Sequence, residues 1–464
     1  MTSIPQVSRM LRTLFEEDAI ELGKQAGMRQ RSMSFPQLAW LLVLGWWKQP
    51  TAGPSALARF AGSLGSTLSK QAVDCHLTER TADWLLALVQ RAVEYVVCAR
   101  AISLPLLQRF SAVLLEDGSS ISLPSALGSV WGGCGGSPSS SGNDPKTQAA
   151  LKITVRWDVL AGRLHGPYLQ EGRRHELASV LREQAMPRGS LWIADLGYWT
   201  LKWLHHLSEQ GIFFLMRYKA GIVLWVGKER LDLLAILPKA TGERLEMLVD
   251  VGGDRRLKAV RRLSERVPPE VASQRQERIK EAACRHSKPV NPLVMELANW
   301  TLVVTNVPAP WLSFEQAFAL VRARWQIELL FKLWKQQGLL DEWNTSKPWH
   351  ILCQVYAKRL SMVVQHWLVL LSCWDDPHHS LSSESRDPAR AASHLGSWPV
   401  PASSFVPSDS SRGSMCAWRL FHSCPLHSFE YFLPLVERFG PGLNLTPMGE
   451  GKPRPYSVRR LRTE

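Results

Sequence analysis

Residues 321–336 read VRARWQIELLFKLWKQ and carry the most specific pattern in the chain. Arg324 and Glu328 are four residues apart and Lys335 follows seven later, so an α-helix with about 3.6 residues per turn places them on one stripe. A second, apolar stripe predicts packing against a sheet and consists of Ile327, Leu330, Phe331 and Trp334. Such a charge pattern is most often a solvent-exposed Arg–Glu pair. The alternative interpretation is a carboxylate presented to a metal ion beside two phosphate-binding cations.

Two aspartates precede this helix at positions where ligands commonly bind. The apolar segment 112–115 predicts a short strand that runs into Asp117, and the apolar segment 191–194 predicts another that ends at Asp195. Strand alternation directs Glu116 to the opposite face from Asp117, so these two acids should not act as a pair. The carboxyl ends of strands in α/β sheets are where ligands usually bind, although Asp before Gly is also common in turns and helix caps.

Three motifs, in this order along the chain, resemble those of DDE-type transposases of bacterial insertion sequences. They are Asp117-Gly118-Ser119 after a strand, Asp195-Leu196-Gly197-Tyr198 after a strand, and Arg324-x3-Glu328-x6-Lys335 in a late helix. The helix motif is typical of the group with the Tyr-x2-Arg-x3-Glu-x6-Lys signature, and the resemblance covers residues 35–375. The signature Tyr is Val321 here, so a hydroxyl that helps relatives hold a phosphate near the cut end is missing.

The resemblance implies an α/β fold with an RNase H-like catalytic core, a helical N-terminal domain and a β-rich insertion. Asp117, Asp195 and Glu328 would be the catalytic residues and would hold two divalent ions, Mg²⁺ or alternatively Mn²⁺. Hard oxygen ligands suit Mg²⁺, and two metals ~4 Å apart can activate the nucleophile and stabilise the leaving oxygen of a phosphodiester. Arg324 and Lys335 would bind backbone phosphates of the element end. Water would attack first, followed by the freed DNA 3′-hydroxyl.

Trp300 is a further candidate for DNA binding. It lies before Val321 at a spacing that resembles the place where some relatives put a Trp that stacks on a flipped-out base. Stacking on an aromatic face is worth about 1–3 kcal/mol per base, which offsets much of the cost of unstacking. The alternative is a Trp buried in the core of a strand.

The patterns and the resemblance together divide the chain into regions. A helical, DNA-binding N-terminal region spans 1–105, the first part of the core spans 106–211, and the β-rich insertion spans 212–310. The final helices of the core span 311–375, and a loosely ordered C-terminal region spans 376–464.

Local patterns also predict individual elements. Residues 55–77 predict helix, turn and helix, with Ser69 as an N-cap of the second helix. This unit fits either DNA binding or an ordinary helical bundle, and its sparse local charge favours the bundle. Residues 175–184 predict a helix, and residues 314–339 predict one long helix.

The charge of the chain favours a polyanionic partner. The 55 Lys and Arg residues exceed the 41 Asp and Glu residues by 14, and the densest basic stretch, 255–288, is typical of a solvated face or a phosphate-binding surface. The apolar runs 35–47 and 360–374 are too short for a bilayer span of roughly 20 residues, and the chain opens without a signal-peptide pattern. We therefore expect a cytoplasmic, nucleoid-associated bacterial protein with no membrane partner.

Three functions compete on this basis. The first is a transposase that binds the terminal inverted repeats of its own element, cuts at their ends and joins them to target DNA, as a dimer in a synaptic complex. The second is a catalytically impaired relic that only binds DNA, suggested by Val321 and the irregular region 376–428. The third is a structural or interaction protein whose basic charge is incidental.

Overall fold

The computed structural model describes residues 4–30, 33–98, 104–133, 149–254, 256–336 and 338–372. The predicted C-terminal region 376–464 lies outside the described residues, as does the end of the apolar run 360–374.

One mixed sheet runs through the whole molecule, with strand order β3-β2-β1-β4-β5-β10-β9-β8-β6-β7. The pairs β1–β4 and β4–β5 are parallel, and the other neighbours are antiparallel. The strands are β1 (Val113–Leu123), β2 (Ala149–Asp158), β3 (Leu164–Glu171), β4 (Leu191–Ala194), β5 (Phe213–Arg217), β6 (Leu224–Val226), β7 (Glu229–Arg230), β8 (Arg244–Val251), β9 (Leu257–Arg266) and β10 (Trp300–Thr305).

Strand β1 is longer than its sequence predicts. The apolar run ends at Leu115, but β2 pairs with β1 as far as Leu123. These cross-strand hydrogen bonds keep the polar second half of β1 in the sheet. Pairing with β4 stops earlier, because β4 ends at Ala194 opposite Glu116. Asp117 is therefore an interior residue of β1 that lies just beyond the end of a neighbouring strand, rather than the residue that follows a strand.

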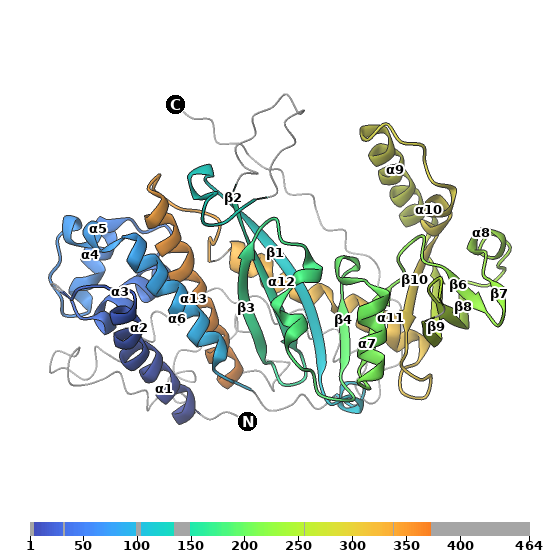
Figure 1. The fold of residues 1–464 in the computed structure, drawn as a ribbon, viewed down its shortest axis with the longest axis horizontal. Helices are drawn as coiled ribbons and strands as arrows, with labels where there is room; N and C mark the ends of the chain where they lie inside the picture. Colours follow the sequence, from blue (N-terminus) through green and yellow to red (C-terminus); the bar gives the residue numbers. More distant parts are fainter. Residues whose placement is uncertain are drawn as a thin grey trace.

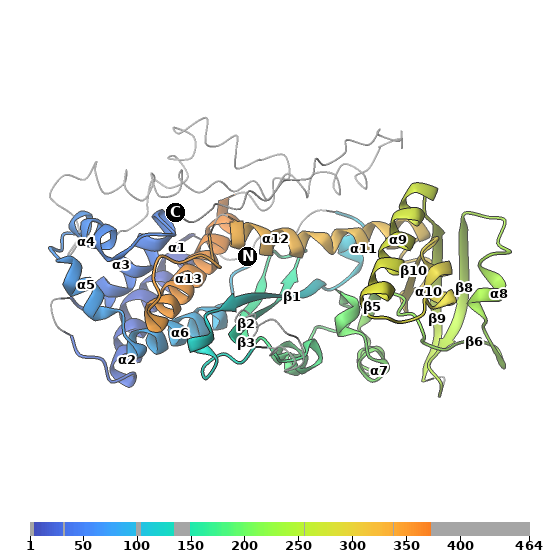
Figure 2. The same ribbon diagram turned by 90° about the horizontal axis from the view of Figure 1, so that it is seen from above.

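The alternation of side chains in β1 and β4 gives the sheet two apolar faces. Leu115 and Ile193 pack in one core cluster with the helices α11 (Phe314–Ala323) and α12 (Trp325–Gln336). Leu114 and Trp192 pack in a second cluster with α7 (Leu201–Glu209). Figure 2 shows α11 and α12 along one side of the sheet and α7 on the other. Odd-numbered residues of these two strands thus face α12.

Helices form one end of the molecule (Figure 1). They are α1 (Ile4–Arg12), a π-helical segment (Thr13–Asp18), α2 (Ala19–Gln25), α3 (Phe35–Lys48), α4 (Pro54–Ser63), α5 (Lys70–His76) and α6 (Glu79–Glu94). The last described helix, α13 (Pro348–Ser372), packs against α3 and α6, and its His366 ring also contacts the Trp157 ring of β2. The Gln354 side chain donates to the Pro50 carbonyl at 2.8 Å, so the chain returns to its N-terminal helices after crossing the sheet.

The predicted helix, turn and helix in residues 55–77 are confirmed as α4 and α5. The Ser69 hydroxyl accepts a hydrogen bond from the Ala72 amide at 3.1 Å, as an N-cap does. Asp74 of α5 pairs with Lys347 at 2.7 Å. This ion pair connects the unit to the segment that leads into α13.

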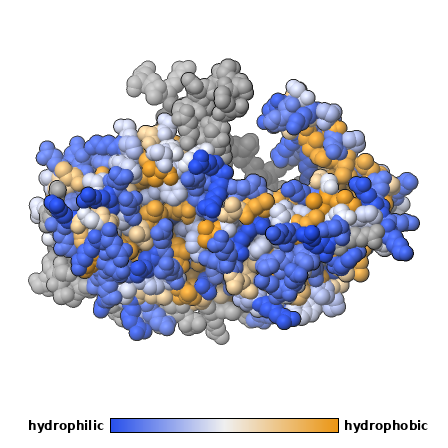
Figure 3. Space-filling view, viewed as in Figure 1, coloured by the Kyte–Doolittle hydropathy of each residue, from blue (hydrophilic) through white to orange (hydrophobic). Residues whose placement is uncertain are grey.

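The predicted β-rich insertion is built from strands and helices that extend the sheet. β10 pairs with β5 on one side and β9 on the other, so the sheet is continuous across residue 211. The insertion also carries the short helices α8 (Leu233–Ile236) and α10 (Pro292–Leu297). The basic stretch 255–288 is divided mainly between β9 and the helix α9 (Pro269–Arg285), which was not predicted. Glu, Arg, Lys, Gln and Ala favour helix, and proline fits the first helical position. Helix α9 projects from the body, and hydrophilic residues cover its outer end (Figures 1 and 3).

Two predicted helices differ in the structure. Residues 175–184 form two short 3₁₀ turns, because the His175 and Ser179 side chains cap them by accepting from Leu177 and Leu181 amides. The long helix predicted over 314–339 divides into α11 and α12 at Arg324. Among the described residues, no helix is both long enough and apolar enough to cross a membrane.

Candidate active site

The parallel pairing of β1 and β4 brings the two predicted catalytic aspartates side by side. Leu115 pairs with Ile193 and Glu116 with Ala194, so one further step in the same register places Asp117 beside Asp195. Both carry odd numbers and therefore face α12. Asp195 begins the 3₁₀ turn Leu196–Tyr198, but its carboxylate makes no capping hydrogen bond to that turn. The carboxylate is thus not committed to the local role that Asp before Gly often has.

Arg324 connects Asp117 to the third predicted carboxylate, Glu328. Its guanidinium lies 2.6 Å from Glu328 Oε1 and 3.4 Å from Asp117 Oδ2. The Arg324 and Asp117 side chains are only 12% and 16% exposed, so this is not a solvated surface pair. The helix break at Arg324 occurs where this side chain turns towards β1. The simple interpretation of an exposed i,i+4 pair on α12 is therefore wrong.

Burial raises the pKa of Asp117 to about 6. The Gly118 amide, which donates to Asp117 Oδ1 at 2.8 Å, and the Arg324 guanidinium both lower this pKa. Asp195 and Glu328 act in the opposite direction and raise it, because each adds negative charge nearby. Asp195 and Glu328 are thus each close enough to repel Asp117, and the site around Asp117 favours a cation.

The chemistry of this donor set fits a hard divalent ion. Three carboxylates offer the oxygen ligands that Mg²⁺ prefers, and the mutual repulsion at Asp117 is the kind that a bound cation relieves. Within the described residues, no three Asp, Glu, His or Cys side chains are arranged as a ready metal site. Arg324 lies between two of the three carboxylates instead, and it supplies the positive charge there.

Lys335 ties the far end of α12 to the same strand. Its ammonium donates to the Ser120 carbonyl of β1 at 2.9 Å and remains solvent-accessible. Arg324, at the junction of α11 and α12, and Lys335, near the end of α12, therefore both reach β1. Phosphate binding by these two cations stays a prediction.

Trp300 lies in the core of the insertion. Its side chain is 2% exposed, its indole N–H donates to Glu296 at 3.3 Å, and the Arg266 guanidinium lies 4.4 Å from the centre of its ring. Base stacking by Trp300 would require the ring to leave this site. The arrangement matches the alternative interpretation of a Trp buried in a strand.

Val321 is packed into the apolar core of α11. It is 8% exposed and belongs to the cluster that also contains Phe318 and Ile327. Where the signature Tyr would place a hydroxyl, the Val321 side chain makes apolar contacts within the core.

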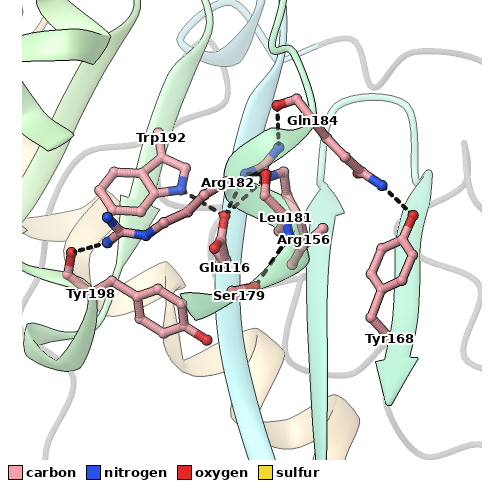
Figure 4. A network of polar contacts seen from close by, with 9 residues as sticks. All are labelled: Glu116, Arg156, Tyr168, Ser179, Leu181, Arg182, Gln184, Trp192 and Tyr198. Carbon is pink, nitrogen blue, oxygen red and sulfur yellow. Dashed lines mark hydrogen bonds and ion pairs between the residues drawn. The ribbon is translucent and has the colours of Figure 1, made fainter. Parts of the chain in front are cut away.

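Sequence reasoning missed a buried polar network on the reverse face of the same strands (Figure 4). Glu116 and Arg156 form an ion pair at 2.8 Å, with both side chains 1% exposed. A possible signal was a charged residue within each of two largely apolar strands. Their partnership could not be read from sequence, because it depends on the pairing of β1 with β2.

Comparison with known proteins identifies the class to which this fold and site belong. The family model described as "Transposase DDE domain" matches residues 109–364, more than half of the chain. The chain belongs to this family of transposases. Membership implies that DNA is the substrate and that divalent metal ions are required.

Three relatives illustrate the range of similarity. The transposase for insertion sequence element IS231F of Bacillus thuringiensis subsp. israelensis is 24% identical over 388 residues, covering 77% of this chain and 78% of the relative. The transposase for IS1151 of Clostridium perfringens is 22% identical over 283 residues, covering 57% and 58%. A putative transposase for IS186A of Escherichia coli K12 is 28% identical over 219 residues, covering 45% and 59%.

Proposed function

We propose that the protein is an active transposase that binds the terminal inverted repeats of an insertion sequence, cuts at their ends and joins them to target DNA. The observation that supports this most is the convergence on one face of the sheet. The register of β1 and β4 ends at Glu116 opposite Ala194, one residue before Asp117 and Asp195, and Arg324 links Asp117 to Glu328. The names of the relatives as insertion-sequence transposases support the same activity.

Asp117, Asp195 and Glu328 would hold two divalent ions, Mg²⁺ or alternatively Mn²⁺. Bound there, the ions would supply Lewis-acid stabilisation of a phosphodiester undergoing in-line attack. Arg324 and Lys335 would bind phosphates of the element end and hold the scissile bond next to the carboxylates. The nucleophiles are water and then the freed 3′-hydroxyl. A stacking role for Trp300 is left out of this proposal because the ring is buried.

The finer architecture follows from the same site. We place the RNase H-like core in strands β3, β2, β1, β4 and β5 with α11 and α12, and the insertion in β6 to β9 with α8 to α10. The helical end formed by α1 to α6 and α13 would contribute DNA binding. Two ends must be brought together for joining, so we expect a dimer on DNA, acting at the bacterial nucleoid.

A cleavage and joining assay tests the proposal against its main alternative, a relic that only binds DNA. A labelled duplex that carries the inverted repeat of the element would be incubated with the full chain, with Mg²⁺ or with EDTA. We expect cutting at the repeat end and joining to a target plasmid only with Mg²⁺, and neither with a scrambled repeat. Specific binding without cutting in Mg²⁺ or Mn²⁺ would instead establish the relic.

A further inference from the structure

We propose that Glu116, Arg156 and Arg182 form a buried positioning network that fixes Asp117 and Asp195 relative to each other. The network lies on the opposite face of the sheet from α12 and contacts neither DNA nor the carboxylates themselves. This inference rests on the proposed function, because it assigns the network to the catalytic geometry rather than to folding alone.

Glu116 is the centre of the network. Its Oε2 atom accepts hydrogen bonds from Arg156 Nε at 2.8 Å and from the Trp192 indole N–H at 3.0 Å. Glu116 precedes Asp117 in β1, Arg156 belongs to β2, and Trp192 lies three residues before Asp195 in β4. One buried oxygen therefore ties together the strand of each catalytic aspartate and a third strand.

The network continues to the turn that begins at Asp195. Arg156 also donates to the carbonyl of Leu181 at 2.6 Å, which fixes the 3₁₀ segment that carries Arg182. Arg182 in turn donates to the carbonyl of Tyr198 at 2.8 Å. Tyr198 is the last residue of the 3₁₀ turn Leu196–Tyr198, and Asp195 is the residue immediately before that turn. Figure 4 shows this path from Glu116 through Arg156 and Arg182 to Tyr198.

Contact between the two aspartate segments is direct at Gly118. A Cβ atom placed on Gly118 would lie 3.3 Å from the Tyr198 hydroxyl, so the absence of a side chain there lets Tyr198 approach β1 beside Asp117. Arg182 of the network binds the Tyr198 backbone carbonyl, and the absence of a side chain at Gly118 leaves room for the Tyr198 ring. A shift of the turn would thus change the distance between Asp117 and Asp195.

Stability alone accounts poorly for this arrangement. Within the described part of the chain, Glu116 Oε1, Arg182 Nε and the Tyr198 hydroxyl are buried without hydrogen-bond partners. Partly satisfied polar networks cost stability relative to an apolar core, and buried ion pairs are often no more stable than well-packed hydrophobic replacements. Hydrogen bonds with fixed directions do, however, hold two backbone segments in one geometry better than apolar packing does.

The decisive variant is Arg182→Met, which removes the hydrogen-bond donor to the Tyr198 carbonyl. In the wild type the Arg182 guanidinium lies 4.8 Å from the centre of the Trp203 ring, and the unbranched Met side chain can keep this packing contact. Arg182→Lys keeps a donor, and Arg188→Met makes the same chemical change at an exposed position of the same connecting segment. Each full-length variant would be measured for melting temperature, element-end binding, cutting rate and Mn²⁺ affinity by calorimetry.

We expect Arg182→Met to keep its melting temperature and DNA affinity but to lose about 10-fold to 100-fold in cutting rate and Mn²⁺ affinity, as supporting residues around metal sites do. Arg182→Lys should recover part of both losses, and Arg188→Met should match the wild type. The double variant Glu116→Met/Arg156→Leu, which leaves no unpaired charge, should fold and show the same losses.

Cutting and Mn²⁺ affinity at wild-type levels in a folded Arg182→Met protein would overturn the proposal. So would losses that only follow a fall in melting temperature, since these would indicate a structural role. Absence of cutting by the wild type would count against the proposed function instead, and Mn²⁺ affinity alone would then decide the positioning role.

Discussion

At the scale of single residues, the burial of Asp117 carries an energetic cost, which the proposed catalytic role would explain. Its folded pKa of about 6 exceeds the ordinary value of 3.8, because the ionised carboxylate is buried near Asp195 and Glu328. The protonated form stabilises the fold fully below pH 3.8, and this stabilisation is lost as the pH rises through about 6. At neutral pH the site therefore costs stability, by ~2–3 kcal/mol for a shift of this size.

Asp117→Asn removes this charge and should stabilise the folded protein at neutral pH while abolishing cutting. We expect a melting temperature above that of the wild type at pH 7.5, with a difference that shrinks towards pH 4, where wild-type Asp117 is protonated. Calorimetric melts of both proteins across this range would measure it. A variant that melts at or below the wild-type temperature at pH 7.5 would show that the carboxylate is not strained by burial.

Substitution of Val321 tests whether the missing Tyr hydroxyl at this position limits the activity of the site. The side chain is 8% exposed within the core, so Val321→Tyr should overpack α11 and cost about 1–3 kcal/mol without raising the cutting rate. Val321→Phe is the matched control, since it adds the ring without the hydroxyl. A cutting rate that rises with Tyr and not with Phe would show that the missing hydroxyl limits activity.

At the scale of elements, the sequence predicted those that local pattern determines. The buried strand 191–194 has its predicted bounds because an apolar run specifies it, and the apolar run 35–47 forms α3, which begins at a Ser34–Gln37 capping box. The full length of β1 and the division at Arg324 could not be predicted, because they depend on β2 and on Asp117. Of the site, the sequence supplied the candidate carboxylates and cations, but not the network behind them.

Gly118→Ala tests the close packing of β1 against the Asp195 turn. The added methyl group would lie 3.3 Å from both the Ile153 carbonyl and the Tyr198 hydroxyl. We expect a loss of about 1–2 kcal/mol in the free energy of unfolding, by overpacking, together with slower cutting.

Gly253→Ala is the control for this change, because a Cβ there meets nothing within 4 Å. Its free energy of unfolding, from urea titration, should stay within about 0.5 kcal/mol of the wild type. Equal effects of the two substitutions would contradict a specific contact at Gly118.

At the scale of the whole molecule, the structure shows where some of the basic residues behind the net charge of +14 lie. Lys335 reaches the strand that carries Asp117, and α9 presents basic residues on a projection at the opposite end from α1 to α6 (Figure 1). A DNA duplex that spans these places would bind mainly through its phosphates. Its affinity should therefore fall steeply with salt, because each phosphate contact releases counterions.

Lys335→Gln should lower the slope of log affinity against log salt by about 0.9, the value for one phosphate contact. Lys202→Gln, on the exposed side of α7 across the sheet, is the control and should leave the slope unchanged. Fluorescence anisotropy with an element-end duplex at several salt concentrations would measure both. Equal slopes for Lys335→Gln and the wild type would remove Lys335 from the DNA-binding surface.

The most direct measurement of the central claim is strand cutting by Asp117→Asn, Asp195→Asn and Glu328→Gln on one element-end duplex in Mg²⁺. All three variants should bind the duplex as the wild type does and should cut it at a rate indistinguishable from background. Retained cutting in any one of them would contradict the assignment of Asp117, Asp195 and Glu328 as the catalytic carboxylates.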